Sequence, residues 1–491
     1  MRNRTPIAIV TLSMIVALIS TPAHPLAAHR DNDFEPQIAN IDGPSAADKT
    51  ATAIALSTHE LTLAERRHGQ DHPGVVKALR NLASIYEESG RKDDAELLYR
   101  RALALTEKTL GPDHASIIPV LDSLGSLYYR QARFSDAEVQ LKRSLLLSEK
   151  SFGSYHQNVA KTLGNLALVY KAQGRAGDAI PLLERALAIG EKEPRSAGSW
   201  LGQLTNRLGV IYADQGRTGD TEQLFKRAIA IYEKSDDPNE STGHILNNLA
   251  ILYLGQGRYA EAEETAKRSL ILLDRGPEND DIRVVESLNT LAAIYQAQGR
   301  FLEAEPLAQR SLSIAENLKP GDADVARITN NLALIYKAEG RSADAIPLFE
   351  RALINGEKAL GPDNGWLGVV ANRLALTYID LGQPSKAIPL FKRAIAILEK
   401  SFGPDHQAVA FALTNLSSVC ATEGRYADAE PLLKRALEIR LKLLGPGHPE
   451  VQDTLRALSA VQSSLARATA APHHDVSGRE KSSTLQALTT R

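Results

Sequence analysis

Residues 245–262 read ILNNLAILYLGQGRYAEA, and this stretch contains the pattern from which most of the chain is built. Leu249 and Tyr253 stand four residues apart, so both fall on one face of a helix. The residue after Leu249 is small enough for a second helix to approach closely. Gly257 supplies the backbone freedom for a turn, and a second run with helical spacing begins near Ala262. The stretch therefore predicts two helices joined by a tight turn.

The dipeptide Gly-Arg at this turn returns at a fixed interval along the chain. Successive copies, two of them degenerate, begin 41 or 42 residues apart and define nine units between residues 74 and 448. A period of this length indicates a solenoid, in which each helical pair packs mainly on its neighbours. The nine dipeptides are Gly90-Arg91, Ala132-Arg133, Gly174-Arg175, Gly216-Arg217, Gly257-Arg258, Gly299-Arg300, Gly340-Arg341, Gly382-Gln383 and Gly424-Arg425.

The order Leu, small residue, Tyr, Gly and Ala on two helices resembles the tetratricopeptide repeat. The 42-residue form is similar to the repeats of kinesin light chain and its bacterial relatives, as is the linker Gly-Pro-Asp-His at 111–114 and 403–406. The resemblance implies an all-α, right-handed superhelical solenoid of helix-turn-helix repeats. It also implies that the first helix of each repeat, helix A, lines the concave face and that the second, helix B, forms the outer layer.

The segments outside the nine repeats complete the predicted domain organisation. Residues 46–73 predict an N-terminal capping helix and residues 449–468 a C-terminal one, each shielding an apolar end of the array. Residues 29–45 are polar and are interpreted as a linker. Residues 469–491 are rich in Ser, Thr and charge, so we expect a disordered tail.

The first 28 residues have the features of an export signal. Two arginines precede an apolar run at 7–19, and small residues follow, with candidate cleavage after Ala23 or Ala28. An uncleaved signal anchor is the alternative interpretation. We expect a bacterial periplasmic or secreted protein with no membrane span after signal cleavage.

The sequence shows no pattern of residues typical of catalysis. A net charge of −2 does not favour nucleic acid as a partner, and no phosphate loop, nucleophile elbow or zinc signature occurs. Five histidines share one place before helix A, so they are spread along an edge instead of converging on a metal. We expect no catalytic residue, cofactor or metal. The five histidines are His72, His114, His156, His406 and His448.

An arginine stands eleven residues after the turn position in every repeat. A ladder of this kind on helix B could bind an anionic surface, but the preferred interpretation is pairing with acidic side chains such as Glu96, Glu138, Glu263, Glu305 and Glu430. The ladder is Arg101, Arg143, Arg185, Arg227, Arg268, Arg310, Arg351, Arg393 and Arg435.

Asparagine recurs on helix A one and two residues before the core leucine. Because Asn is a mediocre helix former, its repetition calls for a further reason. In the resembled family, asparagines at matching places hold the backbone of an extended peptide. The alternative is that Asn bridges adjacent A helices, and both roles stay open. The candidate peptide groove comprises Lys161, Asn165, Asn206, Arg207, His244, Asn247, Asn248, Asn289, Arg327, Asn330, Asn331, Asn372, Arg373 and Asn415.

The basic members of this set, opposed only by Asp122 and Glu286, indicate a ligand with acidic groups. We therefore predict a non-enzymatic scaffold for protein–protein interaction that binds an extended, acidic peptide segment. The alternatives are a structural spacer or self-assembling array and, from another class, a hydrolase built on the repeats.

Overall fold

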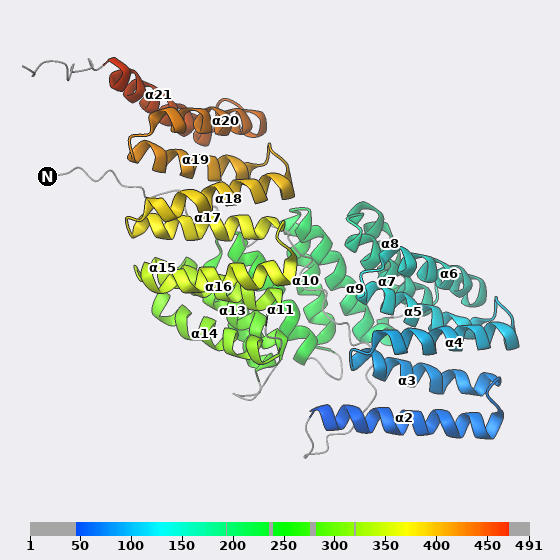
Figure 1. The fold of residues 1–491 in the computed structure, drawn as a ribbon. Coiled ribbons are helices and arrows are strands. Elements are labelled where there is room, and N and C mark those ends of the chain that lie inside the picture. The colour runs from blue at the N-terminus through cyan, green and yellow to red at the C-terminus, as the bar shows by residue number, and fades with distance from the viewer. Residues whose placement is uncertain (1–45, 193, 235–238, 275–280, 319–320, 471–491) are drawn as a thin grey trace, which may run out of the picture. The chain divides into compact units, whose positions relative to one another are not determined.

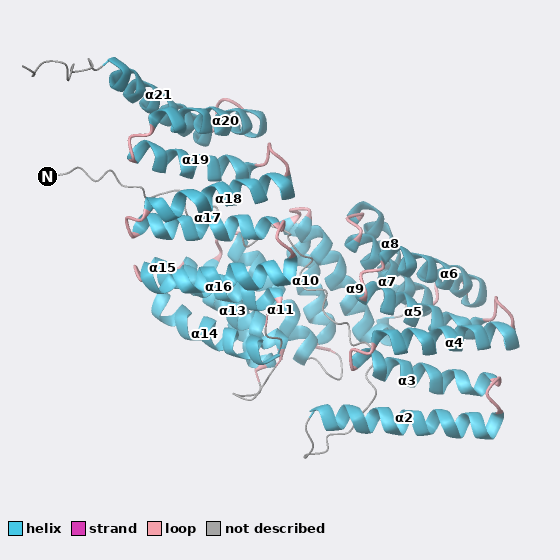
Figure 2. Cartoon of the chain, viewed as in Figure 1, coloured by secondary structure: helices cyan, strands magenta, loops and turns pink. Residues whose placement is uncertain are grey.

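The computed structural model describes residues 46–192, 194–234, 239–274, 281–318 and 321–470. In these ranges the regular structure consists of α helices and short 3-10 turns, without strands (Figure 2). The predicted export signal, the linker and residues 471–491 of the predicted tail lie outside the described residues. None of the described helices combines the length and apolar character that a membrane crossing requires.

The chain divides into two compact units, Met1–Gln298 and Gly299–Arg491. The first unit contains repeats one to five, helix A of repeat six and a preceding solitary helix, with A and B helices alternating along the chain (Figure 1). Its A helices are α3 (Val76–Glu88), α5 (Ile118–Arg130), α7 (Gln157–Ala172), α9 (Pro194–Asp214), α11 (Asn239–Gly255) and α13 (Ile282–Ala297). Its B helices are α2 (Ala46–His68), α4 (Lys92–Leu110), α6 (Phe134–Phe152), α8 (Ala176–Lys192), α10 (Thr218–Tyr232) and α12 (Tyr259–Leu273).

The second unit starts with helix B of repeat six and alternates in the same way. Its B helices are α14 (Phe301–Leu318), α16 (Ser342–Leu360), α18 (Pro384–Phe402) and α20 (Tyr426–Leu444). Its A helices are α15 (Ala323–Ala338), α17 (Gly365–Asp380), α19 (Gln407–Thr422) and the terminal α21 (Pro449–Ala470). Since α21 ends at Ala470, residues 469 and 470 are helical instead of belonging to the predicted tail.

The turn between helices A and B explains the periodic glycine. Gly257 has φ +72°, a left-handed conformation that favours glycine. This conformation lets the N–H of Arg258 donate to the carbonyl oxygen of Tyr253 at 2.9 Å, which closes the end of helix A. In the degenerate second repeat Ala132 takes the same conformation with φ +58°. The turn geometry is thus kept even where the glycine is lost.

The predicted core positions fill each unit. Leu249, Ala250 and Tyr253 are all buried, and most of the equivalent residues of other repeats are buried too. The small residue beside the leucine is needed for space, because a Cβ at Gly125 would come within 2.6 Å of the Leu141 side chain on helix B. Within a unit a B helix packs on the A helix of its own repeat, as α12 does on α11, and on the A helix of the next repeat, as α12 does on α13. The predicted all-α solenoid of helix-turn-helix repeats is confirmed.

Candidate peptide-binding surface

The candidate groove residues lie on the A helices, and we call the surface that they share in either unit the A-helix surface. In the first unit Asn247 and Asn248 of α11 are buried, with 3% and 4% of their surface exposed. Asn165, Asn206 and Asn289 are half-buried on α7, α9 and α13. The asparagines are therefore set into the surface, deeper than freely exposed side chains.

Two asparagines of the first unit hold buried oxygens that accept no hydrogen bond. Asn206 Oδ1 and Asn247 Oδ1 are shielded from solvent and have no partner in the part of the chain that the structure describes. A buried acceptor without a donor costs about 1–3 kcal/mol. Rotation of either carboxamide toward a bound N–H group would remove this cost. The two oxygens are thus unused hydrogen-bonding capacity at equivalent places in successive A helices.

The equivalent asparagines of the second unit are used to connect helices. Arg373 Nη1 on α17 donates to Asn330 Oδ1 on α15 at 3.2 Å. Asn415 Nδ2 on α19 donates to Asn372 Oδ1 on α17 at 3.1 Å. Asn330 and Asn372 are buried, with 2% and 5% of their surface exposed. In this unit the asparagines bridge successive A helices, which is one of the two roles that the sequence left open.

The remaining candidates differ widely in exposure and contacts. Lys161 is exposed, whereas Arg207, His244 and Arg327 are half-buried. Arg207 Nη1 donates to Asn165 Oδ1 at 3.4 Å, and Arg327 pairs with Asp324 on its own helix. The other two pairs are His244 Nδ1 with Glu286 Oε2 at 3.9 Å and Asn331 Oδ1 with Asn330 Nδ2 at 3.1 Å. The structure thus brings the candidates together within each unit, in small groups.

Asp122 on α5 adds a titratable carboxyl group to the first unit. Its Oδ1 accepts from Ser144 Oγ of α6 at 2.6 Å and from Thr162 Oγ1 of α7 at 3.3 Å. Burial raises the pKa of Asp122 to about 6, although these two hydrogen bonds and the charges of Arg80 and Lys161 favour the ionised form. The Nε of Arg80 on α3 is itself buried without a partner among the described residues.

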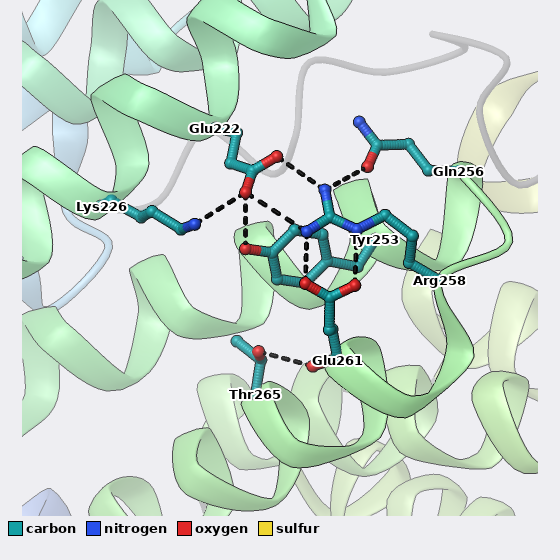
Figure 3. Close-up of polar contacts among 7 residues, drawn as sticks. All are labelled: Glu222, Lys226, Tyr253, Gln256, Arg258, Glu261 and Thr265. Atoms are coloured by element: carbon teal, nitrogen blue, oxygen red, sulfur yellow. Dashed lines mark hydrogen bonds and ion pairs between the residues drawn. The ribbon is translucent and has the colours of Figure 1, made fainter.

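A polar cluster at the turn joins several repeats to the repeat before them, and Figure 3 shows the cluster around Arg258. Arg258 Nη1 pairs with Glu222 Oε2 of the previous B helix at 2.7 Å, and its Nε donates to Glu261 at 2.6 Å. Its guanidinium also lies 4.1 Å from the ring centre of Tyr253, whose hydroxyl donates to Glu222 at 3.0 Å. Hydrogen bonds from Arg258 and Lys226 lower the pKa of Glu222 to about 2.

Sequence reasoning used this arginine as a marker and assigned it no role. The ring contact recurs at Arg91, Arg133, Arg175, Arg217 and Arg341, each over the tyrosine five residues before it. The signal that could have revealed the cluster is an acidic residue three positions after the arginine. That residue is Asp94, Asp136, Asp178, Asp220, Glu261, Glu303, Asp344 or Asp428. The arginine of the dipeptide therefore packs on the tyrosine of its own repeat, and at Arg133, Arg175, Arg258 and Arg341 it also pairs with a glutamate of the preceding B helix.

The arginine ladder on helix B is paired, but with other partners than the sequence suggested. Arg143 pairs with Glu107 of the preceding B helix at 2.7 Å, and Arg435 pairs with Glu399 at 2.5 Å. The predicted partner Glu96 binds Arg100 and Arg133 instead, so that prediction was wrong in detail. The reason is geometric, because Arg101 lies five residues beyond Glu96 on helix B, which places the two side chains on different faces of the helix. The remaining described pairs are Arg101–Glu65, Arg185–Glu149, Arg227–Glu191, Arg268–Glu233, Arg351–Glu316 and Arg393–Glu357.

The linker histidines act at the starts of the A helices. Nδ1 of His156 accepts the backbone N–H of Asn158 at 3.2 Å, and Nδ1 of His406 accepts that of Ala408 at 3.2 Å. His72, His114 and His448 make the equivalent contact. Each ring therefore satisfies one of the unpaired N–H groups at a helix end. Over the described residues no group of three His, Cys, Asp or Glu side chains is placed to hold a metal ion.

Seven stretches of the chain match the model of the tetratricopeptide repeat. They are residues 45–108, 121–192, 200–274, 283–358, 324–400, 366–442 and 408–474. Together they span well over half of the chain, so the chain belongs to the tetratricopeptide repeat family. Repeats of this family are generally non-catalytic scaffolds for protein interaction. No curated protein sequence matches it.

Solved structures of several repeat proteins are similar to this one. The apo form of RapI has a TM-score of 0.56 and 12% identity, with 75% of this chain and 98% of RapI covered. The apo form of the quorum sensor NprR from B. thuringiensis has a TM-score of 0.51 and 17% identity, with 72% and 100% covered. A putative kinesin light chain from Podosopora anserina, with nearly identical repeats, is 24% identical over 42% of this chain and 98% of that one, with a TM-score of 0.36. The first two similarities show a shared fold.

Proposed function

We propose that the chain binds an extended peptide segment of another protein across the A-helix surface of the first unit. The observation that carries this proposal is the pair of buried, unpaired oxygens, Asn206 Oδ1 and Asn247 Oδ1. Both are hydrogen-bond acceptors, and the commonest donor that a protein ligand offers is its backbone N–H. Recognition through the backbone depends little on the ligand's side chains, as suits a scaffold.

The repeat spacing fits a ligand that crosses the A helices. Packed helices lie about 8–10 Å apart, and an extended chain covers about 3.3 Å per residue. Because α9 and α11 both pack on α10, one extended peptide can place an N–H group near α9 and a later one near α11. Asn165 and Arg207 lie in the preceding part of the same surface, and their mutual hydrogen bond of 3.4 Å is long enough to be exchanged for a ligand contact.

The energy of binding would come from several modest contacts. A hydrogen bond that replaces solvent contacts contributes about 0.5–1.5 kcal/mol, and filling a buried acceptor that has no partner adds the removal of its penalty. Because the fold already holds both asparagines on packed helices, little ordering is required of the scaffold. We therefore expect micromolar affinity for short peptides, which several repeats acting together would raise.

The test is a double-mutant cycle that combines protein variants with chemically modified peptides. Peptides of twelve random residues are selected on the full chain, and the Kd of an enriched sequence is measured. The same peptide is then made with single N-methyl groups, each of which removes one backbone donor. We expect one or two N-methyl positions to weaken binding to the wild type about tenfold, the size of one hydrogen bond.

The matched variants test whether the peptide N–H groups identified by N-methylation donate to Asn206 and Asn247. Asn206→Ala with Asn247→Ala should weaken the unmodified peptide and abolish the additional effect of N-methylation. The double variant Asn330→Ala with Asn372→Ala, in the second unit, should bind the unmodified and the N-methylated peptides with the same Kd values as the wild type. If N-methylation still weakens binding to the first double variant, the peptide is held elsewhere and the proposal fails.

The competing hypothesis of a structural spacer or self-assembling array makes a different prediction. A self-assembling chain would sediment as species whose size grows with concentration, and it would select no peptide. The proposed scaffold keeps a constant sedimentation coefficient over the same range and enriches defined sequences. A hydrolase would in addition convert the selected peptide to products, which mass spectrometry of the binding mixture would reveal.

We also propose that the scaffold works in a bacterial cell envelope. The support is the sequence of residues 1–28, with its basic start, short apolar run and small residues. The test is N-terminal sequencing of protein purified from its own host. A mature chain that begins at His24 or His29 agrees with export, whereas an intact Met1 on cytosolic protein contradicts it.

A further inference from the structure

The charges on the three internal A helices of the second unit do not balance. Helices α15, α17 and α19 carry five charged side chains among residues 323–338, 365–380 and 407–422. Asp324 pairs with Arg327, and Lys337 pairs with Asp380 at 3.0 Å. Arg373 is the fifth, and within the described residues it forms no ion pair. The uncompensated positive charge lies near the middle of α17.

Arg373 is poorly solvated for a charged group. Its side chain is half-buried, and burial alone lowers the pKa of its guanidinium to about 10, so the group stays protonated at neutral pH. Of its five N–H donors, one is used, by Nη1 toward Asn330 Oδ1. A buried charge is costly unless an opposite charge and further hydrogen bonds accompany it. Neither an acid nor a second acceptor reaches this guanidinium from the described residues.

We infer that Arg373 is the cationic centre of an anion-binding site on the A-helix surface of the second unit. Its ligand is an oxyanion, either a side-chain carboxylate of an acidic peptide or free inorganic phosphate. Asn330 holds one edge of the guanidinium by accepting from Nη1. The remaining donors face the ligand, and two oxygens of a carboxylate or a phosphate accept two of them in parallel.

This inference is independent of the peptide contact proposed for α9 and α11. It concerns the other unit, and it arises from an unbalanced charge instead of unpaired acceptors. The candidate groove of the sequence contains Lys161, Arg207, His244, Arg327 and Arg373, and the inference singles out Arg373 among them. Arg327 has a partner acid and Lys161 is exposed to solvent, so neither needs a counter-ion as Arg373 does.

The experiment measures anion binding by the full-length chain at constant ionic strength. Thermal melts and fluorescence titrations are recorded with inorganic phosphate and with tetraglutamate, and tetraglutamine serves as the uncharged control. We expect saturable binding of at least one of the two anions to the wild type. In Arg373→Met, which keeps most of the side-chain volume, the half-saturating concentration should rise at least tenfold. Arg456→Met removes an exposed arginine of α21 and should change it less than twofold.

The two anions separate the possible sources of the ligand. Binding of tetraglutamate alone assigns the site to a peptide carboxylate, and binding of phosphate alone assigns it to a free anion. The inference is overturned if the wild type binds neither anion saturably, or if Arg373→Met binds as tightly as the wild type. If tetraglutamate binding is lost in Asn206→Ala with Asn247→Ala but kept in Arg373→Met, the anion belongs to the first unit and only the proposed function survives. Should Arg373→Met fail to fold, Arg373→Lys keeps the charge without the planar fork and should bind at least threefold more weakly.

Discussion

The two units contain the same asparagine pattern and use it differently. In the first unit Asn206 and Asn247 hold buried oxygens without partners among the described residues, while in the second Asn330 and Asn372 accept hydrogen bonds from the next A helix. The donors explain the difference. Arg373 and Asn415 reach back to the preceding helix, but the residues at the corresponding places in the first unit are Asn248 and Thr290. Asn248 is turned toward His244, 3.4 Å away, and Thr290 is short.

This difference shows that a repeated residue does not imply a repeated role. An asparagine becomes part of the architecture where its neighbour in the next repeat can donate to it, and it stays available where the neighbour cannot. The neighbour stands about 42 residues away in the sequence, so a pattern within one helix carries no information about it. At these positions the second unit has two bridges between A helices, whereas Asn206 and Asn247 of the first unit retain capacity to bind, although Arg207 bridges to Asn165 there.

The largest expected effect tests whether the units share the same apolar core. Leu249→Ala in the first unit and Leu374→Ala in the second should each lower the unfolding free energy by about 2–5 kcal/mol, because both leucines are buried. Arg268→Ala is the matched control, since its ion pair with Glu233 is largely exposed and contributes about 1 kcal/mol or less. Urea melts followed by hydrogen exchange in each unit would measure these losses. Equal losses for all three variants would show that the helix B arginines are structurally as important as the core.

The next effect tests directly whether the asparagines have different roles in the two units. Asn330→Ala with Asn372→Ala removes two bridges between helices and leaves Arg373 with no side-chain partner, so the second unit should lose about 1–3 kcal/mol of unfolding free energy. Asn206→Ala with Asn247→Ala removes two unsatisfied oxygens and should leave the first unit unchanged or slightly more stable. Hydrogen exchange of α17 and α11 reports each unit separately. If both double variants lose stability equally, the asparagines are architectural throughout.

A carboxyl group gives the first unit a pH dependence of its own. The folded pKa of Asp122, about 6, lies above the ordinary value of 3.8, so the folded state holds this proton more tightly than the unfolded state. The resulting stabilisation is complete below pH 4 and disappears as the pH rises through 6. Asp122→Asn stays neutral, so its unfolding free energy at pH 7 should exceed that of the wild type by about 3 kcal/mol.

The same variant should show little advantage at pH 4. Asp93→Asn changes an exposed carboxylate of α4 and should leave the pH profile as it is. Chemical melts at pH 4, 5, 6 and 7 provide the comparison. A wild-type profile that Asp122→Asn does not flatten would mean that Asp122 ionises normally.

The sequence was sufficient for the fold because the fold depends on local patterns. Leucine and tyrosine four residues apart, a small neighbour and a turn glycine recur at each repeat, and each acts within one helical pair. The polar site was less predictable for the opposite reason. Arg143 could not be matched to Glu107, nor Arg258 to Glu222, because each pair joins different repeats and depends on how two side chains extend across a packed interface. Burial of Asn247 and Asn330 likewise follows from packing between helices.

The smallest expected effect comes from a substitution that gives the first unit the hydrogen bond between A helices found in the second unit. Thr290→Asn places on α13 the donor that Asn415 provides on α19, opposite the unpaired Asn247 Oδ1 of α11. A new hydrogen bond there should add about 0.5–1.5 kcal/mol to the unfolding free energy of the first unit. It should also weaken the binding of selected peptides, because the oxygen proposed to meet the ligand would already be engaged. Thr290→Val, which has a similar volume and no donor, should neither raise the unfolding free energy in this way nor weaken peptide binding. If Thr290→Asn gains stability and still binds peptide as tightly as the wild type, Asn247 does not contact the peptide, and Asn206 remains the candidate contact.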